Sequence, residues 1–232
     1  IPPLKRYLAW AGDFACGNMG TSLLYHQPVE KVIQIRFASS VWLMAAAWIL
    51  SGVAGVILGM AAGARKGSLA DRVISAYALV TASTPAFWVA LVLLMVFAVW
   101  LKVLPVGLSV PIGADAAAVS IADRIRHGIL PAAALSLTGI SNITLHTREK
   151  MIQVMESDYV LFARTRGESM SSIVLRHGLR NMILPALTLQ FASISEIFGG
   201  SVLVEQVFSY PGLGQAAVSA GLGSDIPLLM GI

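Results

Sequence analysis

The residues of this chain that could do chemistry are few and far apart. The single cysteine, Cys16, excludes an internal disulfide and any metal cluster that needs several cysteines. The four histidines lack the spacing of metal ligands and stand at His26, His127, His146 and His177. No serine–histidine–aspartate set is indicated. The sequence therefore predicts no catalytic residue and no metal site, and each histidine is interpreted as a polar surface or interface residue.

A nucleotide-binding motif is also missing. No Gly-x4-Gly-Lys-Ser/Thr pattern occurs, and the stretch Arg65-Lys66-Gly67-Ser68 ends like one but lacks the upstream glycine. We therefore expect that the chain does not hydrolyse ATP by itself and holds no cofactor of its own.

Glu196 is a candidate because of its surroundings. It lies in an apolar stretch, where an ionised carboxylate is costly unless it is paired or hydrated. Two interpretations stay open: a polar residue lining a solute pathway, or a carboxyl group hydrogen-bonded to a neighbouring helix.

The composition defines the class of protein that must position these residues. Of 232 residues, 56% are hydrophobic and 12% are charged, and the mean hydropathy is +0.77. Soluble domains carry about 25% charged residues. These values exclude a soluble globule or a disordered chain and indicate an all-α, polytopic membrane protein. The net charge of +4 is better explained by cytoplasmic loops than by nucleic-acid binding.

Apolar runs give the expected crossings. Residues 37–64 and 73–101 contain no charge, and each is long enough to span about 30 Å of hydrocarbon. Pro85, in the middle of the second run, predicts a kinked or broken helix. Further crossings are expected at 129–147 and 182–204, with Pro131 and Pro185 in their first turns, and another is expected to start at 228.

The segments between the runs are expected outside the membrane. Residues 1–36 form an extracytoplasmic N-terminal segment, 102–128 a loop with a short helix near 114–126, and 205–227 a glycine-rich loop. Loops 65–72 and 148–181 hold nine basic residues against seven on the other side, which places these two loops in the cytoplasm. The chain begins with Ile and stops within an apolar run, so we expect a piece of a longer protein.

The most charged stretch is predicted to fold as a helix–glycine–helix unit. Tyr159, Phe162 and Arg166 fall at helical spacing, Ser157 or Asp158 can cap the helix start, and Gly167 can end it. Ser169 to Ser172 offer caps for a second helix. The unit is either an interfacial helix whose basic residues reach lipid phosphates, or a rigid knob that docks on a cytoplasmic partner.

The same stretch resembles the signature loop of ABC-transporter permeases that docks on the ATPase. It contains Asp158-Tyr159-Val160, then Ala163 to Gly167, then Arg176-His177-Gly178-Leu179-Arg180-Asn181 with Leu184-Pro185. Thr165, Arg166 and Gly178 depart mildly from the pattern. Other similar segments follow in family order: Gly12-Asp13, Gly20-Thr21-Ser22, Pro28-Val29, Thr84 to Trp88, and Glu205 to Gly214. The chain is thereby similar to the B-type subunit of the dipeptide/oligopeptide/nickel permease family.

This resemblance implies a type I ABC importer (MetI-like) permease fold whose first and last helices are largely missing from the chain. It implies an ATP-driven importer of peptides, nickel or metal chelates in a bacterial or archaeal inner membrane, working by alternating access. The implied partners are a homologous C-type permease, two cytoplasmic ATPases that hold ATP and Mg, and an extracytoplasmic solute-binding protein.

Three sets of candidate site residues follow. The ATPase-coupling set is Asp158, Tyr159, Phe162, Ala163, Arg164, Arg166, Gly167 and Glu168. The pathway set is Pro85, Phe87, Trp88, Glu196, Gly199, Gly200 and Ser201. The binding-protein contact set is Tyr210, Pro211 and Gly212. Each set has an alternative role that stays open. Pro85, Phe87 and Trp88 could simply pack a kinked helix, and Gly199 to Ser201 could let two helices approach closely. The binding-protein contact set could close a re-entrant loop.

A rival hypothesis is a secondary transporter or channel subunit without an ATPase, in which Glu196 would be a proton or ion site. Dependence of uptake on ATP separates the two. A membrane-embedded enzyme is disfavoured, because the sequence offers no paired carboxylates or metal motif for facing helices.

Overall fold

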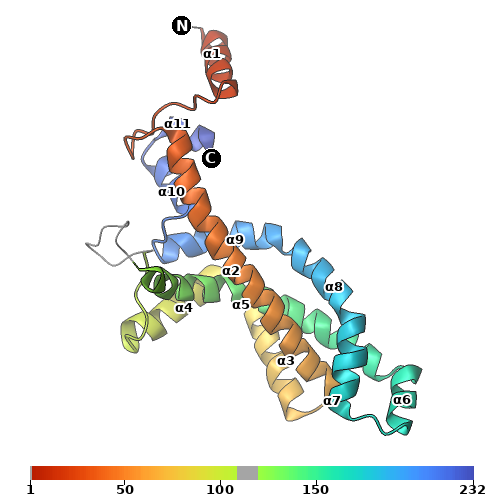
Figure 1. Ribbon diagram of the computed structural model, residues 1–232. Helices are drawn as coiled ribbons and strands as arrows, with labels where there is room; N and C mark the ends of the chain where they lie inside the picture. Colours follow the sequence, from red (N-terminus) through yellow and green to blue (C-terminus); the bar gives the residue numbers. More distant parts are fainter. Residues whose placement is uncertain (1, 109–119) are drawn as a thin grey trace.

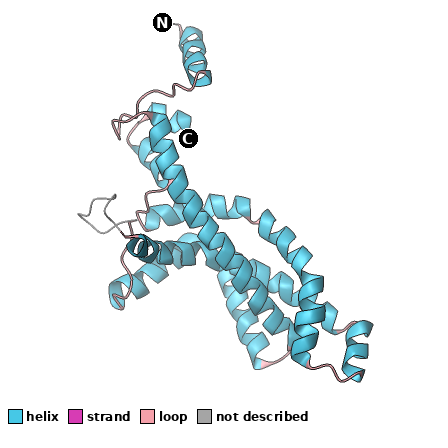
Figure 2. Cartoon of the chain, in the orientation of Figure 1, coloured by secondary structure: helices cyan, strands magenta, loops and turns pink. Residues whose placement is uncertain are grey.

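The computed structural model describes residues 2–108 and 120–232. Across these residues the chain is helical without strands (Figure 2), which confirms the all-α class, and one isolated bridge joins Thr21 and Pro28. The α-helices are α1 (Pro3–Ala15), α2 (Val29–Ala64), α3 (Leu69–Ala82), α4 (Ala86–Leu93), α5 (Ile121–Met155), α6 (Asp158–Thr165), α7 (Met170–Ile173), α8 (Leu179–Ala192), α9 (Ile194–Val207), α10 (Leu213–Leu222) and α11 (Ile226–Gly231). Two π-helical stretches, η1 (Leu94–Trp100) and η2 (Val174–Gly178), follow α4 and α7.

Two long helices form the spine of the molecule. Helix α2 has 36 residues and α5 has 35, and both are long and apolar enough to cross a membrane. A glycine series on α2 lets them approach closely: a Cβ on Gly55 would lie 2.7 Å from the Cβ of Ile143, and one on Gly59 would lie 2.5 Å from that of Thr147. Since lipid gives helices little hydrophobic reason to associate, such close packing of small residues holds the pair together.

Two further apolar segments are bent helix pairs. Helix α3 meets the α4–η1 pair at 110°, and Pro85 is the N-cap of α4, so the predicted break at this proline is confirmed. The segment Met170–Ala192 meets α9 at 46° beside Ser193, inside the expected 182–204 crossing. By length and composition, the described chain thus has two spanning helices, or up to four if each bent pair is one span.

Several helix boundaries differ from the expected ones. Helix α5 begins at Ile121 and runs through Pro131 to Met155, so this proline lies inside a helix and not in a first turn. Pro185 likewise lies inside α8. Packing against neighbouring helices stabilises a membrane helix despite the backbone hydrogen bond that a proline removes. The short helix expected near 114–126 is, from Ile121 on, the start of α5, and its residues before 120 fall outside the described ranges.

The C-terminal segment is also more ordered than expected. Residues 205–227, predicted to be a glycine-rich loop, contain the end of α9 and all of α10. In Figure 1, α10 and α11 lie beside the N-terminal half of α2, while α3, α7 and α6 lie toward its other end. Helix α2 therefore connects two ends of the molecule that carry different candidate sites.

Candidate functional site

The predicted helix–glycine–helix unit is present, and residues 157–181 are called the elbow here. Helix α6 ends at Thr165, and Gly167, two residues further on, has a φ of +81°, the left-handed conformation that suits glycine. The N–H of Glu168 donates to the carbonyl of Ala163 at 3.2 Å, which closes the helix end. Ser169 Oγ accepts from the N–H of Ser172, as predicted, whereas Ser157 stands at the N-cap without a side-chain capping bond. Local sequence thus sets both ends of the turn.

A small apolar cluster fixes the elbow to the end of α5. Val160, Ala163 and Ile173 are almost fully buried and pack with Val154. Ala163, predicted as a coupling residue, therefore lies beneath the exposed face and supports it by packing. Because the cluster joins α6, α7 and α5, the elbow is a packed extension of the α5 helix and not a loose linker.

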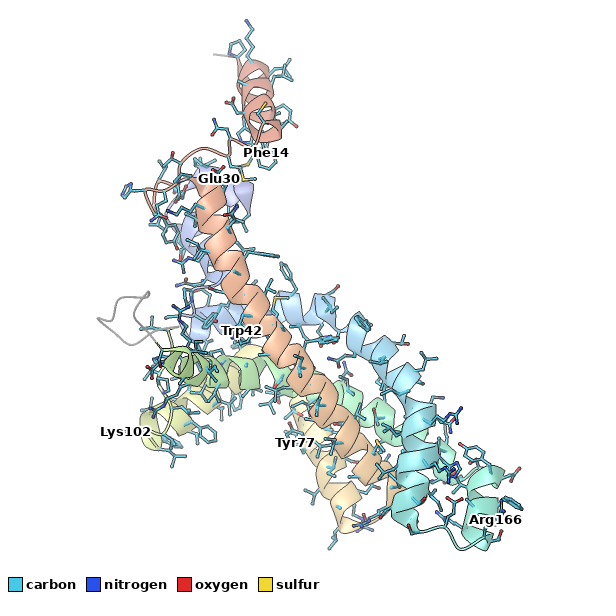
Figure 3. The ribbon with its side chains drawn as sticks, in the orientation of Figure 1. Phe14, Glu30, Trp42, Tyr77, Lys102 and Arg166 are labelled. Atoms are coloured by element: carbon cyan, nitrogen blue, oxygen red, sulfur yellow. The ribbon has the colours of Figure 1, made fainter. Side chains whose placement is uncertain are left out.

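The outward face of α6 is apolar and cationic. Phe162 is 62% exposed, and the guanidinium of Arg166 lies over its ring at 5.4 Å. Leu161 is equally open and was missed, since five consecutive apolar residues at 159–163 give no periodicity that separates inside from outside. Asp158, Arg164 and Gly167 are also exposed. In Figure 3, Arg166 marks one end of the molecule, opposite Glu30 and Phe14.

The two halves of the sequence motif meet at the elbow. Asn181 Nδ2 donates to the hydroxyl of Tyr159 at 3.3 Å, and Tyr159 packs beside His177, with ring centroids 6.1 Å apart. His177 Nε2 lies 3.5 Å from a carboxylate oxygen of Glu168. Tyr159 and Glu168 therefore point partly inward, toward the second half of the motif. Within the predicted ATPase-coupling set, Phe162 and Arg164 therefore project further from the molecule than Tyr159 and Glu168 do.

Gly178 explains one departure from the family pattern. A Cβ at this position would lie 2.9 Å from the Sδ and Cε atoms of Met151, so glycine lets η2 approach α5 closely. An alanine here would require Met151 to shift.

Two ion pairs join α5 to the helix ends beside it. Arg148 makes a two-pronged contact with Asp71, at 2.5 Å from Nε to Oδ1 and 2.9 Å from the terminal nitrogen to Oδ2. Asp71 is buried and also accepts from the N–H of Gly67. Lys66 and Glu156 form a second pair at 2.7 Å, with both side chains well exposed. The start of α3 is thereby held against α5 just before the elbow.

The predicted pathway residues lie on two separate segments, the start of α4 and helix α9. Phe87 and Trp88 are exposed on α4, directly after the break at Pro85. On α9, Glu196 is exposed and Gly199 faces open space.

The last two pathway candidates, Gly200 and Ser201, face inward. A Cβ on Gly200 would lie 3.3 Å from Leu135 of α5, and Ser201 is buried, with its hydroxyl bonded to the carbonyl of Phe198. Close helix approach is therefore the role that the geometry gives to Gly200.

The predicted binding-protein contact set is mostly internal. Tyr210 and Gly212 are buried, and only Pro211 is partly exposed. A Cβ on Gly212 would lie 2.2 Å from the carboxyl carbon of Glu205. Glu205 is fully buried and accepts from Ser40 Oγ of α2 at 2.6 Å and from the N–H of Gln215 in α10 at 3.0 Å. The motif around Gly212 thus ties the start of α10 to α2.

Asp225 has a similar role at the start of the next helix. Its carboxylate caps α11 by accepting from the N–H of Leu228, and it also accepts from Ser22 Oγ at 2.5 Å and from the N–H of Leu24. Burial opposes ionisation of this group, but these hydrogen bonds outweigh it and hold the pKa of Asp225 below its ordinary value.

The fold and these surfaces together define a class: a multi-pass helical membrane protein that presents a braced elbow at one end. The chain belongs to the family of binding-protein-dependent transport system inner membrane components, which matches residues 55–232. It is therefore a permease subunit of an ABC transporter and not an enzyme. Within the described residues, no group of three or more His, Cys, Asp or Glu side chains could hold a metal ion.

Curated relatives align with nearly the whole chain. The oligopeptide transport system permease protein AppB of Bacillus subtilis is 34% identical over 230 residues, which cover 99% of this chain and 72% of the relative. A putative peptide permease protein of Brucella suis is 37% identical over 227 residues, which cover 97% of this chain and 70% of the relative. The di/tripeptide transport system permease protein DppB of Pseudomonas aeruginosa is 32% identical over 243 aligned residues, which cover 98% of this chain and 72% of the relative.

Proposed function

We propose that this chain is the B-type permease of an ATP-driven importer of di- and oligopeptides in a bacterial or archaeal inner membrane. The single observation that carries the proposal is the braced elbow, in which two distant halves of one motif meet beneath an exposed apolar and cationic face. The names of the three relatives favour peptides over nickel or metal chelates as the cargo.

The partners proposed are a homologous C-type permease, two cytoplasmic ATPases that bind ATP and Mg, and an external solute-binding protein. Phe162 and Leu161 enter a groove on one ATPase, and Arg164 and Arg166 make polar contacts at its rim. A desolvated aromatic anchor with neighbouring arginines is typical of the residues that dominate binding energy at interfaces.

Coupling follows from the packing of the elbow. When the ATPases close, α6 moves as a rigid body, because Val160 and Ala163 join it to α5. The movement passes through α5 to α2 and to α3, which is tied to α5 by the Asp71–Arg148 pair. The two permeases then alternate between outward- and inward-open arrangements, each favoured by a different state of the ATPases.

The test is Gly167→Asp in the complete transporter. The substitution strains the turn at a φ of +81°, where an added Cβ has no atom within 4 Å, so it alters the docking face while the membrane-spanning helices keep their packing. We expect the amount of ATPase that co-purifies with the permease to fall about tenfold or more, because hot-spot losses exceed about 2 kcal/mol. ATP-dependent uptake is expected to fall with it.

The matched control is Gly17→Asp. Gly17 has a φ of +86°, also with nothing within 4 Å, but it lies after α1, far from the elbow. This variant should retain both ATPase and uptake. Normal ATPase co-purification with Gly167→Asp would refute the docking role, and wild-type uptake that survives ATP depletion but stops with an uncoupler would favour a secondary transporter.

A further inference from the structure

Polar side chains of two membrane segments face each other across a small pocket. Asn142 and His146 lie one turn apart on α5, while Ser193 lies at the 46° bend between α8 and α9 and Glu196 lies in the first turn of α9. These four residues, with Gly139, Ile143, Leu189 and Ala192, line a pocket of about 130 Å³. Residues of α5 and of the α8–α9 segment both line this pocket, so two segments contribute polar groups to the same space.

A second cavity continues this pocket along α5. It has a volume of about 350 Å³, and it shares His146 and Leu189 with the first. Its lining extends to Glu149 and Lys150 at the charged end of α5, and Thr188 of α8 lies opposite. At 1.5 Å per residue, Asn142 and Lys150 are about 12 Å apart along the helix. One groove therefore runs from the bend at Ser193 to the end of the apolar stretch of α5, with polar side chains at both ends and a largely apolar wall between them.

The groove presents its polar groups openly. Asn142, His146, Thr188 and Glu196 are all exposed in this chain. Across residues 2–108 and 120–232, no ion pair or hydrogen bond engages the Glu196 carboxylate. A carboxylate within a membrane segment is stable only if it faces water or a polar partner and not lipid.

We infer that this groove is the inner half of the solute pathway and that it takes a zwitterionic solute in extended form. The inference rests on the proposed function and adds the residues and the chemistry of recognition. The Glu196 carboxylate receives the ammonium group of a peptide, while Asn142 and His146 exchange hydrogen bonds with its backbone amides. The groove carries two carboxylates, Glu196 and Glu149, and one ammonium group, that of Lys150. Charged groups of both signs fit a zwitterion better than an apolar or purely anionic solute.

Single-cysteine accessibility tests the groove in the complete transporter. In a Cys16→Ser background, the variants Asn142→Cys and His146→Cys are treated, in inverted membrane vesicles, with a membrane-impermeant cationic thiol reagent. The control is Leu187→Cys on α8, which is 44% exposed but lines a separate apolar groove with Trp48 and Val53. Mass spectrometry of the isolated permease reports labelling of this chain alone.

We expect positions 142 and 146 to react about tenfold faster than position 187, since an apolar setting raises a thiol pKa by about a unit and depletes the reactive thiolate. Trapping the ATPases with ATP and vanadate should slow the reaction at 142 and 146. If positions 142 and 146 were labelled as slowly as position 187, both with and without ATP and vanadate, the inference would be overturned. Labelling that appears only when the second permease is omitted would also overturn it, by making the groove a subunit interface.

The charge of Glu196 has its own test. Glu196→Gln should lower peptide uptake about tenfold or more, the value of one charged hydrogen bond, while Glu196→Asp restores most of it. ATPase co-purification should stay normal in both variants, which separates this result from a failure of the docking proposal. Unchanged uptake with Glu196→Gln, or equal loss with Glu196→Asp, would contradict recognition by the carboxylate.

Discussion

At the scale of single residues, two buried carboxylates organise the end of the molecule opposite the elbow. Glu205 and Asp225 each accept a backbone N–H at the start of a helix, and each also reaches a serine near the start of the chain, Ser40 or Ser22. A buried carboxylate is tolerated because several donors satisfy it. These two residues join α10 and α11 to α2 and to the loop before it.

Gly212→Ala tests this arrangement at its tightest point. The new Cβ would overlap the Glu205 carboxyl group, so we expect a loss of about 1–3 kcal/mol in stability, as for other overpacked sites. Thermal unfolding of the purified permease in detergent measures it. Gly199→Ala is the control, because its Cβ meets no atom within 4 Å. Equal melting temperatures for the two variants would show that the Glu205 contact carries no such constraint.

Residues whose role is local were predictable, and residues whose partners are distant were not. Gly167 was expected to end a helix because a glycine after a helical pattern has one common use. The bond between Ser40 and Glu205 joins residues 165 positions apart, and no pattern in one sequence reports it. For the same reason, Tyr210 and Gly212 were expected as surface contacts, although they are buried.

At the scale of elements, breaks with a chemical cause were predictable. The 110° break at Pro85 follows from a proline in mid-span. The 46° bend beside Ser193 has no proline at the break, so the sequence offers no local signal for it. Pro131 and Pro185 misled the prediction of helix starts, since proline at a first turn and proline inside a packed span have the same local sequence.

The tie between α3 and α5 gives a prediction at this scale. Asp71→Asn leaves the Arg148 guanidinium without its charged partner in a largely buried place, and we expect a loss of about 1.5–3 kcal/mol in stability. Glu156→Gln breaks the exposed pair with Lys66 and should cost less than about 1 kcal/mol. Denaturant or thermal unfolding of the two purified variants compares them. Equal losses would mean that burial does not set the strength of these pairs.

At the scale of the whole molecule, two long helices connect two specialised ends. Helix α2, with 36 residues, is about 54 Å long, so it extends beyond a bilayer core of about 30 Å. Its N-terminal half holds the Ser40–Glu205 contact, the Asp225 contacts lie in the loop just before it, and its other end lies beside the elbow region (Figure 1). A movement of the elbow can therefore be transmitted along the long helix α2 to the end of the molecule that carries α10 and α11.

Site-specific photo-crosslinking from position 162 in the assembled transporter tests the docking of the elbow most directly. A photoreactive phenylalanine analogue replaces Phe162, and the same analogue at Phe37, half exposed at the other end of α2, serves as the control. We predict a crosslink from position 162 to the ATPase subunit and none to it from position 37. If position 162 crosslinked only to lipid or gave no protein adduct, the elbow would not be the surface on which the ATPase docks.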